Sequence, residues 1–432
     1  MPNAGDNFER INSFLHYIYL PFYQPERAAL LFPGVDVEND IPVQSVIEMD
    51  EREVIKYGIQ LLKSTFSKII ESTGTQNHIV PLSGGYDSRA IIATLIDAGL
   101  KDQILAVTFG VPGTWDFELG TGLAHRFGIK HRQINLNHVE VSTEKLLETA
   151  LAGCSWTFLI DGFYNSLIPK EFGDNALYWS GYMGDTLAGG VRARLSIKHN
   201  SYWGDARKRY AKIIGILHST IGMPSPDYDP VKSLPSDPIF ANSPIPYIDQ
   251  LYFFIHNVNY IKSVVIPEGF DYLLPFCSPG WVKFMLSLSL PQRIDKNVYK
   301  KILLTAYPEY YKYPVTYLRG AALPSSWLGK KYRYGLFKAS EIIAASSPIW
   351  NRIGVYKRFN YLDYDVSVRE RIDFQKMVKE NIYDLKARQI IDWLDPERMW
   401  LDHIGDKADY GFTLLLLTAL EISFKSEEIL SR

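Results

Sequence analysis

Cysteine is scarce in this sequence of 432 residues, and neither sign of charge is in excess. The two cysteines, Cys154 and Cys277, are too few and too far apart for a disulfide framework or a four-cysteine zinc site. The formal net charge is −2, so no surplus of cations indicates binding to nucleic acid or to an acidic membrane. These features favour a reducing, cytoplasmic location and weigh against nucleic acid as a partner.

Long apolar runs are also missing. The longest near the C-terminus covers residues 412–424 and is interrupted by Glu421. It is shorter than the roughly 20 residues that a membrane-spanning helix requires, so we expect a buried helix there and no membrane contact. The first ten residues contain acids and no apolar core, so we expect no secretory signal.

Strand-like and helix-like patterns alternate through the first half of the chain. Runs typical of strands lie at 78–82, 103–110, 130–136 and 175–181, and helical patterns lie at 88–98, 116–127 and 144–153. This order predicts an α/β fold in which helices flank a parallel sheet. Ligands of such sheets bind beyond the carboxyl ends of the strands.

The domain organisation follows from length and composition. A single core rarely serves more than about 250–300 residues, so we expect one large domain with appendages, or two domains. Residues 1–72 form an N-terminal helical segment, and residues 73–432 form the main domain with a mostly helical C-terminal half. Within the main domain, residues 223–247 contain seven prolines, which predicts a long irregular loop or lid.

One segment, "VPLSGGYDSRA" (Val80–Ala90), carries the first functional signal. Glycines between a strand and a helix let backbone N–H groups converge on one point, and the helix N-terminus attracts anions. Ser83 and Ser88 add hydroxyl groups, whereas Asp87 would repel a phosphate unless it holds Mg²⁺. The pattern therefore indicates a phosphate site with a metal, although an ordinary turn with a helix N-cap is the simpler alternative. The P-loop string of Walker A does not occur.

The stretch "SGGYDS" resembles the PP-loop of the N-type ATP pyrophosphatases. Further segments, in the same order, resemble the synthetase domain of the asparagine synthetase family over about 73–432. They are "TFGVPGTWDFELGTGLAHRFGIKH" (108–131), "WSGYMGDTLAGG" (179–190), "LLPFCSPGWVKFMLSLSLPQRI" (273–294) and "WLDPERMWLDHI" (393–404). The 72 residues that precede this region are too few for the N-terminal glutaminase domain of the best-known members, so we expect that domain to be lacking.

The resemblance implies ATP and Mg²⁺ as cofactors. ATP is cleaved between its α and β phosphates, a substrate carboxylate becomes an acyl-adenylate, and an amine or ammonia then forms the amide. The implied metal ligands are Asp87 and Asp185, on neighbouring strand ends. The implied nucleotide-binding residues are Leu82, Ser83, Gly84, Gly85, Asp87, Ser88, Val107, Ser180 and Gly181.

The chain departs from the family pattern where the second step is concerned. Asparagine synthetases have a glutamate where this chain has Tyr182, whereas β-lactam and carbapenam synthetases have a tyrosine there that works with a downstream glutamate. No glutamate lies between Asp185 and Glu268. Glu268 or Asp205 remain as substitutes, or Tyr182 is a packed aromatic residue.

Two further positions differ. The late lysine of the family, which stabilises developing charge, is matched only by Lys312 or Arg319, and Arg319 aligns better. The family's "PFLD" aspartate is replaced, because Phe276 is followed by Cys277 and Ser278, and this weighs against aspartate as the substrate. We expect Cys277 to pack as a small apolar residue.

The sequence thus predicts a cytoplasmic ATP- and Mg²⁺-dependent carbon–nitrogen ligase that acts on a small-molecule or peptide carboxylate. Its nitrogen would come from ammonia, a substrate amine, or a partner glutaminase or other biosynthetic protein. Two alternatives remain open. One is intramolecular lactam formation, as in β-lactam or lasso-peptide cyclases, and the other is a non-catalytic nucleotide-binding partner subunit.

Overall fold

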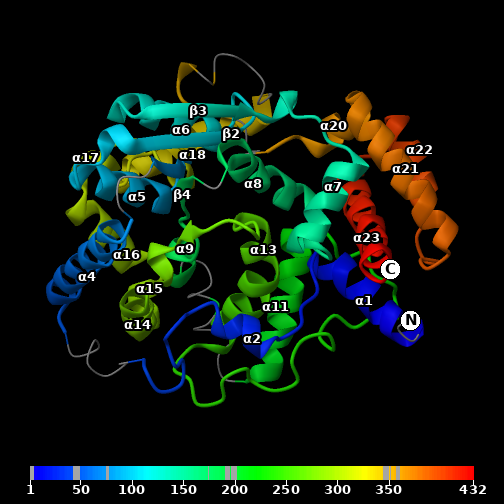
Figure 1. Cartoon of the computed structure of the whole chain (residues 1–432), viewed down its shortest axis with the longest axis horizontal. Helices are drawn as coiled ribbons and strands as arrows, with labels where there is room; N and C mark the ends of the chain where they lie inside the picture. The colour runs from blue at the N-terminus through cyan, green and yellow to red at the C-terminus, as the bar shows by residue number, and fades with distance from the viewer. Residues whose placement is uncertain are drawn as a thin grey trace.

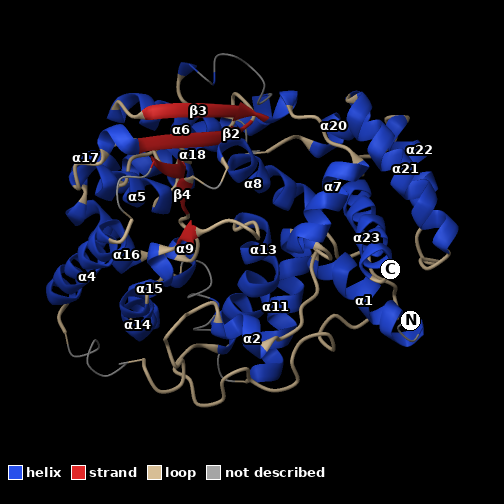
Figure 2. Ribbon diagram, in the orientation of Figure 1, coloured by secondary structure: helices blue, strands red, loops and turns tan. Residues whose placement is uncertain are grey.

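The computed structural model describes residues 4–41, 49–73, 77–173, 175–189, 195, 202–343, 350, 352–356 and 361–432. Its centre is a sheet of five parallel strands in the order β3-β2-β1-β4-β5 (Figures 1 and 2). The strands are β1 (Asn77–Pro81), β2 (Ile104–Gly110), β3 (Lys130–Asn135), β4 (Ala176–Trp179) and β5 (Tyr272–Leu273).

Helices make up most of the remaining described chain. Up to β4 they are α1 (Ala4–Tyr17), α2 (Pro25–Ala29), α4 (Glu51–Glu71), α5 (Asp87–Asp97), α6 (Trp115–Phe127), α7 (Thr143–Thr149), the π-helix η3 (Ala150–Cys154) and α8 (Leu159–Phe172), with short 3₁₀ turns η1 (Lys101–Gln103) and η2 (Leu136–His138). Between β4 and the 3₁₀ turn η5 (Pro275–Cys277) lie α9 (Gly184–Leu187), α11 (Trp203–Leu217), α12 (Tyr247–Leu251), the π-helix η4 (Tyr252–Ile261) and α13 (Lys262–Val265).

The C-terminal part of the described chain is helical, as the sequence predicts. It comprises α14 (Pro279–Ser287), α15 (Leu290–Arg293), α16 (Asn297–Ala306), α17 (Pro308–Tyr311), the 3₁₀ turn η6 (Thr316–Leu318), α18 (Trp327–Ile343), α20 (Tyr364–Glu370), α21 (Ile372–Arg388), α22 (Pro396–Ile404) and α23 (Gly411–Leu430). The apolar run at 412–424 lies within α23, where Leu414, Leu415, Leu416, Leu417 and Leu420 are buried. The prediction of a buried helix is confirmed.

The α/β prediction is confirmed: the four predicted strands and the helices α5 and α6 lie within two residues of the expected bounds. The helix expected at 144–153 is α7 only as far as Thr149, and the chain continues as the π-helix η3. Helix α6 ends where expected, because Gly128 adopts a left-handed conformation with φ 61°. The fifth strand was not predicted, since β5 has only two residues and so shows no periodicity.

The two faces of the sheet contribute to different cores. Ile79 and Val107 belong to one apolar cluster, with α7, α8, α21 and α23, whereas their neighbours Val80 and Ala106 belong to another, with α4, α5 and α14. Successive residues of a strand point to opposite faces, so these near-continuous apolar runs fit a sheet that is covered on both sides.

The N-terminal helices are packed onto the rest of the chain. Helix α1 contacts α11 and α23, and Arg10 forms an ion pair with Glu427, so the N-terminal and C-terminal helices lie side by side (Figure 1). Helix α4 contacts α14 and α16. It begins at a capping box, in which Asp50 and Glu53 exchange hydrogen bonds between side chain and backbone.

The proline-rich segment is irregular, as predicted, but it is held against α1 and α11. Asn12 accepts a hydrogen bond from the backbone of Ser225 at 2.6 Å, and the hydroxyl of Tyr17 donates to the carbonyl of Pro230 at 2.6 Å. Trp203 and Arg207 donate to three further carbonyls of the segment. None of its residues lines the cavity at the strand ends, so the prediction of a lid is not supported.

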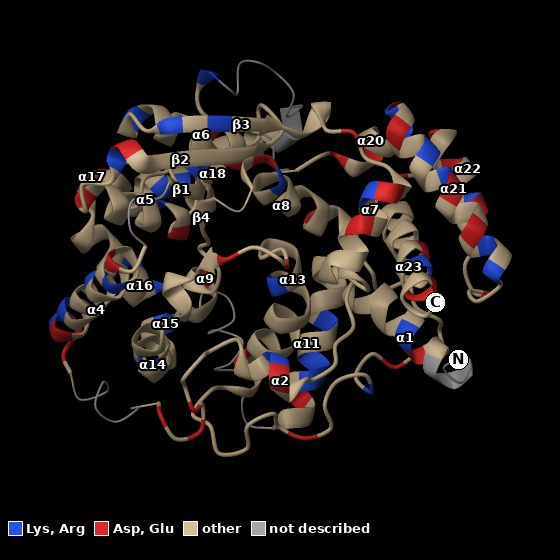
Figure 3. Cartoon of the chain, viewed as in Figure 1, with Lys and Arg blue, Asp and Glu red and all other residues tan. Residues whose placement is uncertain are grey.

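Surface charge and hydropathy add two findings. Lysine and arginine alternate with aspartate and glutamate along described helices such as α21 and α22 (Figure 3). Among the described residues, none of the helices has the length and apolar character needed to cross a bilayer.

Candidate active site

The sheet has one topological switch point. From β1 the chain adds β2 and then β3 on one side, and after α8 it returns to place β4 on the other side of β1. The loops that follow β1 and β4 therefore leave neighbouring strands in different directions. Open α/β sheets bind ligands in the crevice that such a divergence creates.

A cavity of about 340 Å³ lies at this point, a volume within the range of small-ligand sites. It brings together residues from the ends of β1, β2 and β4. Most of the residues predicted from the sequence line it, namely Leu82, Ser83, Gly85, Asp87, Ser88, Val107, Ser180, Gly181, Tyr182 and Asp185. Gly84, Lys312 and Arg319 do not, and Gly190 of the second loop lies outside the described residues.

The first loop is not an ordinary capped turn. Helix α5 begins at Asp87, and no side chain caps its N-terminus. The hydroxyl of Ser83 instead accepts the N–H of Gly85 at 3.1 Å, and the Ser88 hydroxyl accepts the N–H of Ser83 at 3.3 Å. The first N–H groups of a helix have no partner within the helix, so those of α5 lack the side-chain cap that the alternative interpretation requires.

Gly84 does not line the cavity. Its N–H donates to Asp116 at 3.2 Å, and its carbonyl accepts the N–H of Thr316 at 3.1 Å. A Cβ atom at this position would collide with the Thr316 hydroxyl and with Leu119. Gly84 therefore lets the η6 segment approach the first loop closely. This packing role differs from the role in nucleotide binding that the sequence predicted for Gly84.

The second loop is packed against Asp87 through two glycines. A Cβ atom on Gly181 would lie 2.7 Å from Cβ of Asp87, and one on Gly184 would lie 2.6 Å from its Cγ. No real side chain tolerates such distances. The close approach lets the N–H of Asp185 donate to Oδ2 of Asp87 at 3.1 Å.

Two residues that sequence reasoning missed hold the carboxylates. Tyr299 donates its hydroxyl to Oδ1 of Asp87 at 2.5 Å, and Nζ of Lys296 lies 2.6 Å from Oδ2 of Asp185. Burial and the neighbouring Asp185 charge raise the pKa of Asp87 to about 7. Both partners lie at the start of α16, in "DKNVYKK", where the clustered charges are a local sequence signal.

Lys296 is buried, with 8% of its surface exposed. It adopts a left-handed conformation with φ 58° at the N-cap of α16. Its ammonium lies 5.0 Å from the ring centre of Tyr317 and 5.8 Å from that of Tyr86. Aromatic faces attract cations, so both rings stabilise the ammonium beside Asp185.

Two buried arginines position the loops. Arg89 donates to the carbonyls of Gly84 and Pro314 and is fully buried, and burial lowers its pKa to about 10. Arg293 forms a buried ion pair with Asp249 at 2.8 Å and donates to the carbonyl of Leu187, at the end of α9, at 3.1 Å. Each arginine therefore ties one loop to the C-terminal half.

Tyr182 is placed as a packed aromatic residue. Its hydroxyl donates to the carbonyl of Asn257 in the π-helix η4 at 3.0 Å, and burial raises its pKa far above the usual value. Neither substitute for the missing glutamate lines the cavity: Glu268 packs against Gly153, and Asp205 is exposed at the start of α11. The structure thus favours Tyr182 as a packing residue over Tyr182 as one member of a catalytic pair with a carboxylate.

The two predicted cations lie elsewhere. Lys312 is exposed and pairs with Glu309. Arg319 stacks over the rings of Tyr334 and Phe337, 5.0 Å from each ring centre, and lines a second cavity. Cys277 is buried, as expected for a packing residue, and burial raises its pKa to about 12.

The donor set at the first cavity fits Mg²⁺, which prefers one or two carboxylates together with phosphate oxygens and water. Asp87 and Asp185 meet there, and Lys296 and Tyr299 hold them without closing the cavity.

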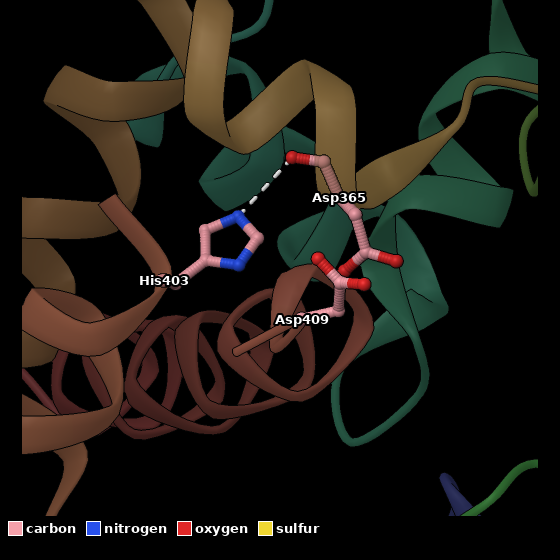
Figure 4. A group of neighbouring side chains, drawn as sticks. All are labelled: Asp365, His403 and Asp409. Atoms are coloured by element: carbon pink, nitrogen blue, oxygen red, sulfur yellow. Dashed lines mark hydrogen bonds between the residues drawn. The ribbon is translucent and has the colours of Figure 1, made fainter. Parts of the chain in front are cut away.

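A second group, Asp365, His403 and Asp409, has the composition of a metal site (Figure 4). Its atoms already have other partners. Nε2 of His403 donates to the Asp365 carbonyl at 3.1 Å, its Nδ1 accepts the N–H of Tyr410 at 3.0 Å, and Asp409 pairs with Arg369 at 2.8 Å. With no lone pair left on the imidazole, this group joins α20, α22 and α23 as a structural contact.

No family model matches the chain, and no curated protein matches it either. The resemblance to the asparagine synthetase family therefore rests on the motifs in the sequence.

Proposed function

We propose that this chain is an ATP- and Mg²⁺-dependent carbon–nitrogen ligase of the asparagine synthetase type, which activates a carboxylate as an acyl-adenylate and releases pyrophosphate. The observation that carries the proposal is the contact between the two loops at the switch point of the sheet. There Asp185 donates its N–H to Asp87 across two glycines, although 98 residues separate the two aspartates.

The cavity has complementary parts for a nucleotide. Ser83, Ser88 and the N-terminus of α5 offer hydrogen-bond donors to phosphate oxygens. Leu82 and Val107 provide an apolar wall for the base. When bound between Asp87 and Asp185, Mg²⁺ would neutralise the charge that builds up on the phosphates.

The reaction has two steps. A carboxylate oxygen bonds to the α-phosphorus of ATP, and the bond from that phosphorus to the bridging oxygen breaks, which releases pyrophosphate. An amine then bonds to the acyl carbon and loses a proton, and the bond between that carbon and the AMP oxygen breaks. The chain's own task is to orient these groups and to balance the charge that develops.

Lys296 supplies the cation that the sequence search assigned to Lys312 or Arg319. Its ammonium is already at the carboxylates, and its stem is buried. If Asp185 held a metal, the ammonium of Lys296, 2.6 Å from that carboxylate, would supply positive charge near the pyrophosphate. A fixed cation in a partly dry site stabilises developing charge far more than one in water.

The alternative of a nucleotide-binding subunit has one observation in its favour. None of the three residues predicted for the second step, Tyr182, Lys312 and Arg319, presents its polar group to the first cavity. Ring closure by a tyrosine–glutamate pair has less support, because the Tyr182 hydroxyl is bound to a backbone carbonyl.

The test combines binding with exchange. Calorimetry measures ATP affinity with and without Mg²⁺, and exchange of labelled pyrophosphate into ATP is screened over a panel of carboxylic acids. Asp87→Asn should abolish both the Mg²⁺ effect and the exchange, whereas Asp97→Asn, at the exposed end of the same helix, should change neither. Binding without exchange for any acid would favour the subunit, and absence of ATP binding would contradict both proposals.

A further inference from the structure

A second cavity, of about 670 Å³, lies beside the first and shares no lining residue with it. Its walls come from three places in the chain: Trp115 at the start of α6, the η6 turn with Arg319, and one face of α18. The proposed reaction needs room for a substrate as well as for ATP, and the first cavity of about 340 Å³ is only half as large.

The lining of this second cavity is cationic. Arg319, Lys330 and Lys338 contribute to it, and the described residues that line it include no aspartate or glutamate. Lys330, Tyr334 and Lys338 are four residues apart along α18, so they share one face of that helix. Arg319 is held in a left-handed conformation with φ 49° and lies over two aromatic rings of the same helix. Three positive groups around one space favour a ligand with more than one negative charge.

The remaining walls are flat and apolar. Trp115 and Phe337 are buried and belong to one small apolar cluster, and Tyr334 faces the same space. Aromatic walls favour a flat or unsaturated body, because ring faces stack on one another and on planar groups. The lining therefore fits an anion whose charges are mounted on such a body.

A hydrogen bond between two side chains connects the lining of the second cavity to the lining of the first. Asp116 lines the first cavity, Thr316 lines the second, and the Thr316 hydroxyl donates to Asp116 at 2.7 Å. Tyr317 also lines the second cavity, and its ring lies 5.0 Å from the ammonium of Lys296. A ligand held here would lie beside the carboxylates and the cation of the first site.

We propose that the second cavity binds the acid substrate of the ligase, a small organic acid with an aromatic or similarly flat body and at least one anionic group besides the carboxylate that is activated. Arg319, Lys330 and Lys338 hold the additional charge, and the aromatic walls hold the body. The role as a substrate site rests on the proposed function, whereas binding of the anion itself does not.

The experiment uses the full chain and a graded series of acids. Calorimetry measures the affinity for benzoate, isophthalate and trimesate, and for the acyclic tricarboxylate tricarballylate. The change in total tryptophan fluorescence, to which Trp115 in the cavity wall contributes, is a second readout. We expect affinity to rise with charge along the benzene series and trimesate to bind more tightly than tricarballylate. The double variant Lys330→Gln/Lys338→Gln should weaken trimesate binding roughly tenfold, because contacts to charged groups are lost.

Lys331→Gln is the matched control. It lies on the same helix, its ammonium lies 4.0 Å from the ring centre of Trp327, and it does not line the cavity. Lys331→Gln should leave the affinity for trimesate unchanged. If the midpoint of thermal unfolding is the same in all variants, unfolding is excluded as the cause of weaker trimesate binding. Saturation with Mg²⁺ and the non-cleavable analogue α,β-methylene-ATP should not displace trimesate.

Three results would overturn the proposal: no binding of any acid in the series, equal affinity in the double variant, or displacement of trimesate by the nucleotide. The last would mean that the acids bind in the nucleotide site. All measurements are made without turnover, so a failure of pyrophosphate exchange would contradict the proposed function and leave this binding result standing.

Discussion

The ammonium of Lys296 lies 2.6 Å from the carboxylate of Asp185, although 111 residues separate the two in the chain. A buried lysine is costly unless a partner balances its charge, and the two aromatic rings beside it add to this balance. The pair therefore holds a cation at the phosphate site in a position that neither neighbouring sequence nor helix periodicity indicates.

The first prediction concerns this cation. Lys296→Gln should lower the rate of pyrophosphate exchange roughly 100-fold, as expected when a fixed charge is removed from a transition state. It should also change how strongly Mg²⁺ affects ATP affinity, because Asp185 loses its partner. Lys301→Gln, on the same helix and paired with Glu51 at the surface, should behave like the original chain; equal losses in both variants would contradict the assignment.

The second prediction concerns the close approach of the two loops. Gly181→Ala places a methyl group against Cβ of Asp87, so the loops must separate, at a cost of about 1–3 kcal/mol in the free energy of unfolding. ATP affinity should also fall, because the two loops that line the cavity are moved apart. Gly122→Ala is the control, since nothing lies within 4 Å of a Cβ atom there, and alanine in a helix should add about 0.5–1 kcal/mol of stability. Urea unfolding and calorimetry measure both effects.

Tyr182→Phe distinguishes packing from catalysis. The variant loses only the hydrogen bond to the Asn257 carbonyl, so we expect a loss of about 1 kcal/mol in stability and little change in the exchange or amide-forming rate. A general acid or base contributes roughly 100-fold or more to a rate. A loss of that size in an otherwise stable Tyr182→Phe protein would restore the catalytic role that the sequence suggested.

The last prediction concerns pH. Asp161 lies at the start of α8 and accepts a hydrogen bond from Tyr260 at 2.5 Å, and burial raises its pKa to about 6. The folded chain thus binds a proton more tightly than the unfolded chain, in which the pKa is about 3.9. Its contribution to stability is present below pH 4 and is lost as the pH rises through 6.

Asp161→Asn does not titrate, so the variant should gain stability relative to the original chain between pH 4 and pH 7, by at most about 3 kcal/mol. Urea unfolding at several pH values measures this difference. Asp102→Asn, in the exposed turn η1, serves as the control. A difference that is constant with pH, or that changes in the opposite direction, would contradict the raised pKa.

Local patterns were enough to predict the framework. The strands from β1 to β4 and their helices follow from alternating apolar runs with glycine stops, because these are properties of short segments. The loop residues of the first cavity could also be named, since the order of the motifs resembles one family, although glycine, serine and aspartate at a strand end also suit an ordinary capped turn. The short β5 and the π-helix η4 carry no comparable signal, because their pairing and geometry depend on neighbours far away in the chain.

The sequence by itself determined the α/β class and most of the residues at the ends of β1, β2 and β4, because period, turn chemistry and motif order are local. Only the tertiary structure decided which cation meets the carboxylates. Lys296, Lys312 and Arg319 are similar in sequence terms, and the packing of α16 buries the first at Asp185, while the second pairs at the surface and the third lines a separate cavity. Lys296 contacts Asp185 because of the direction of its side chain and the long-range packing of α16, and both depend on the whole fold.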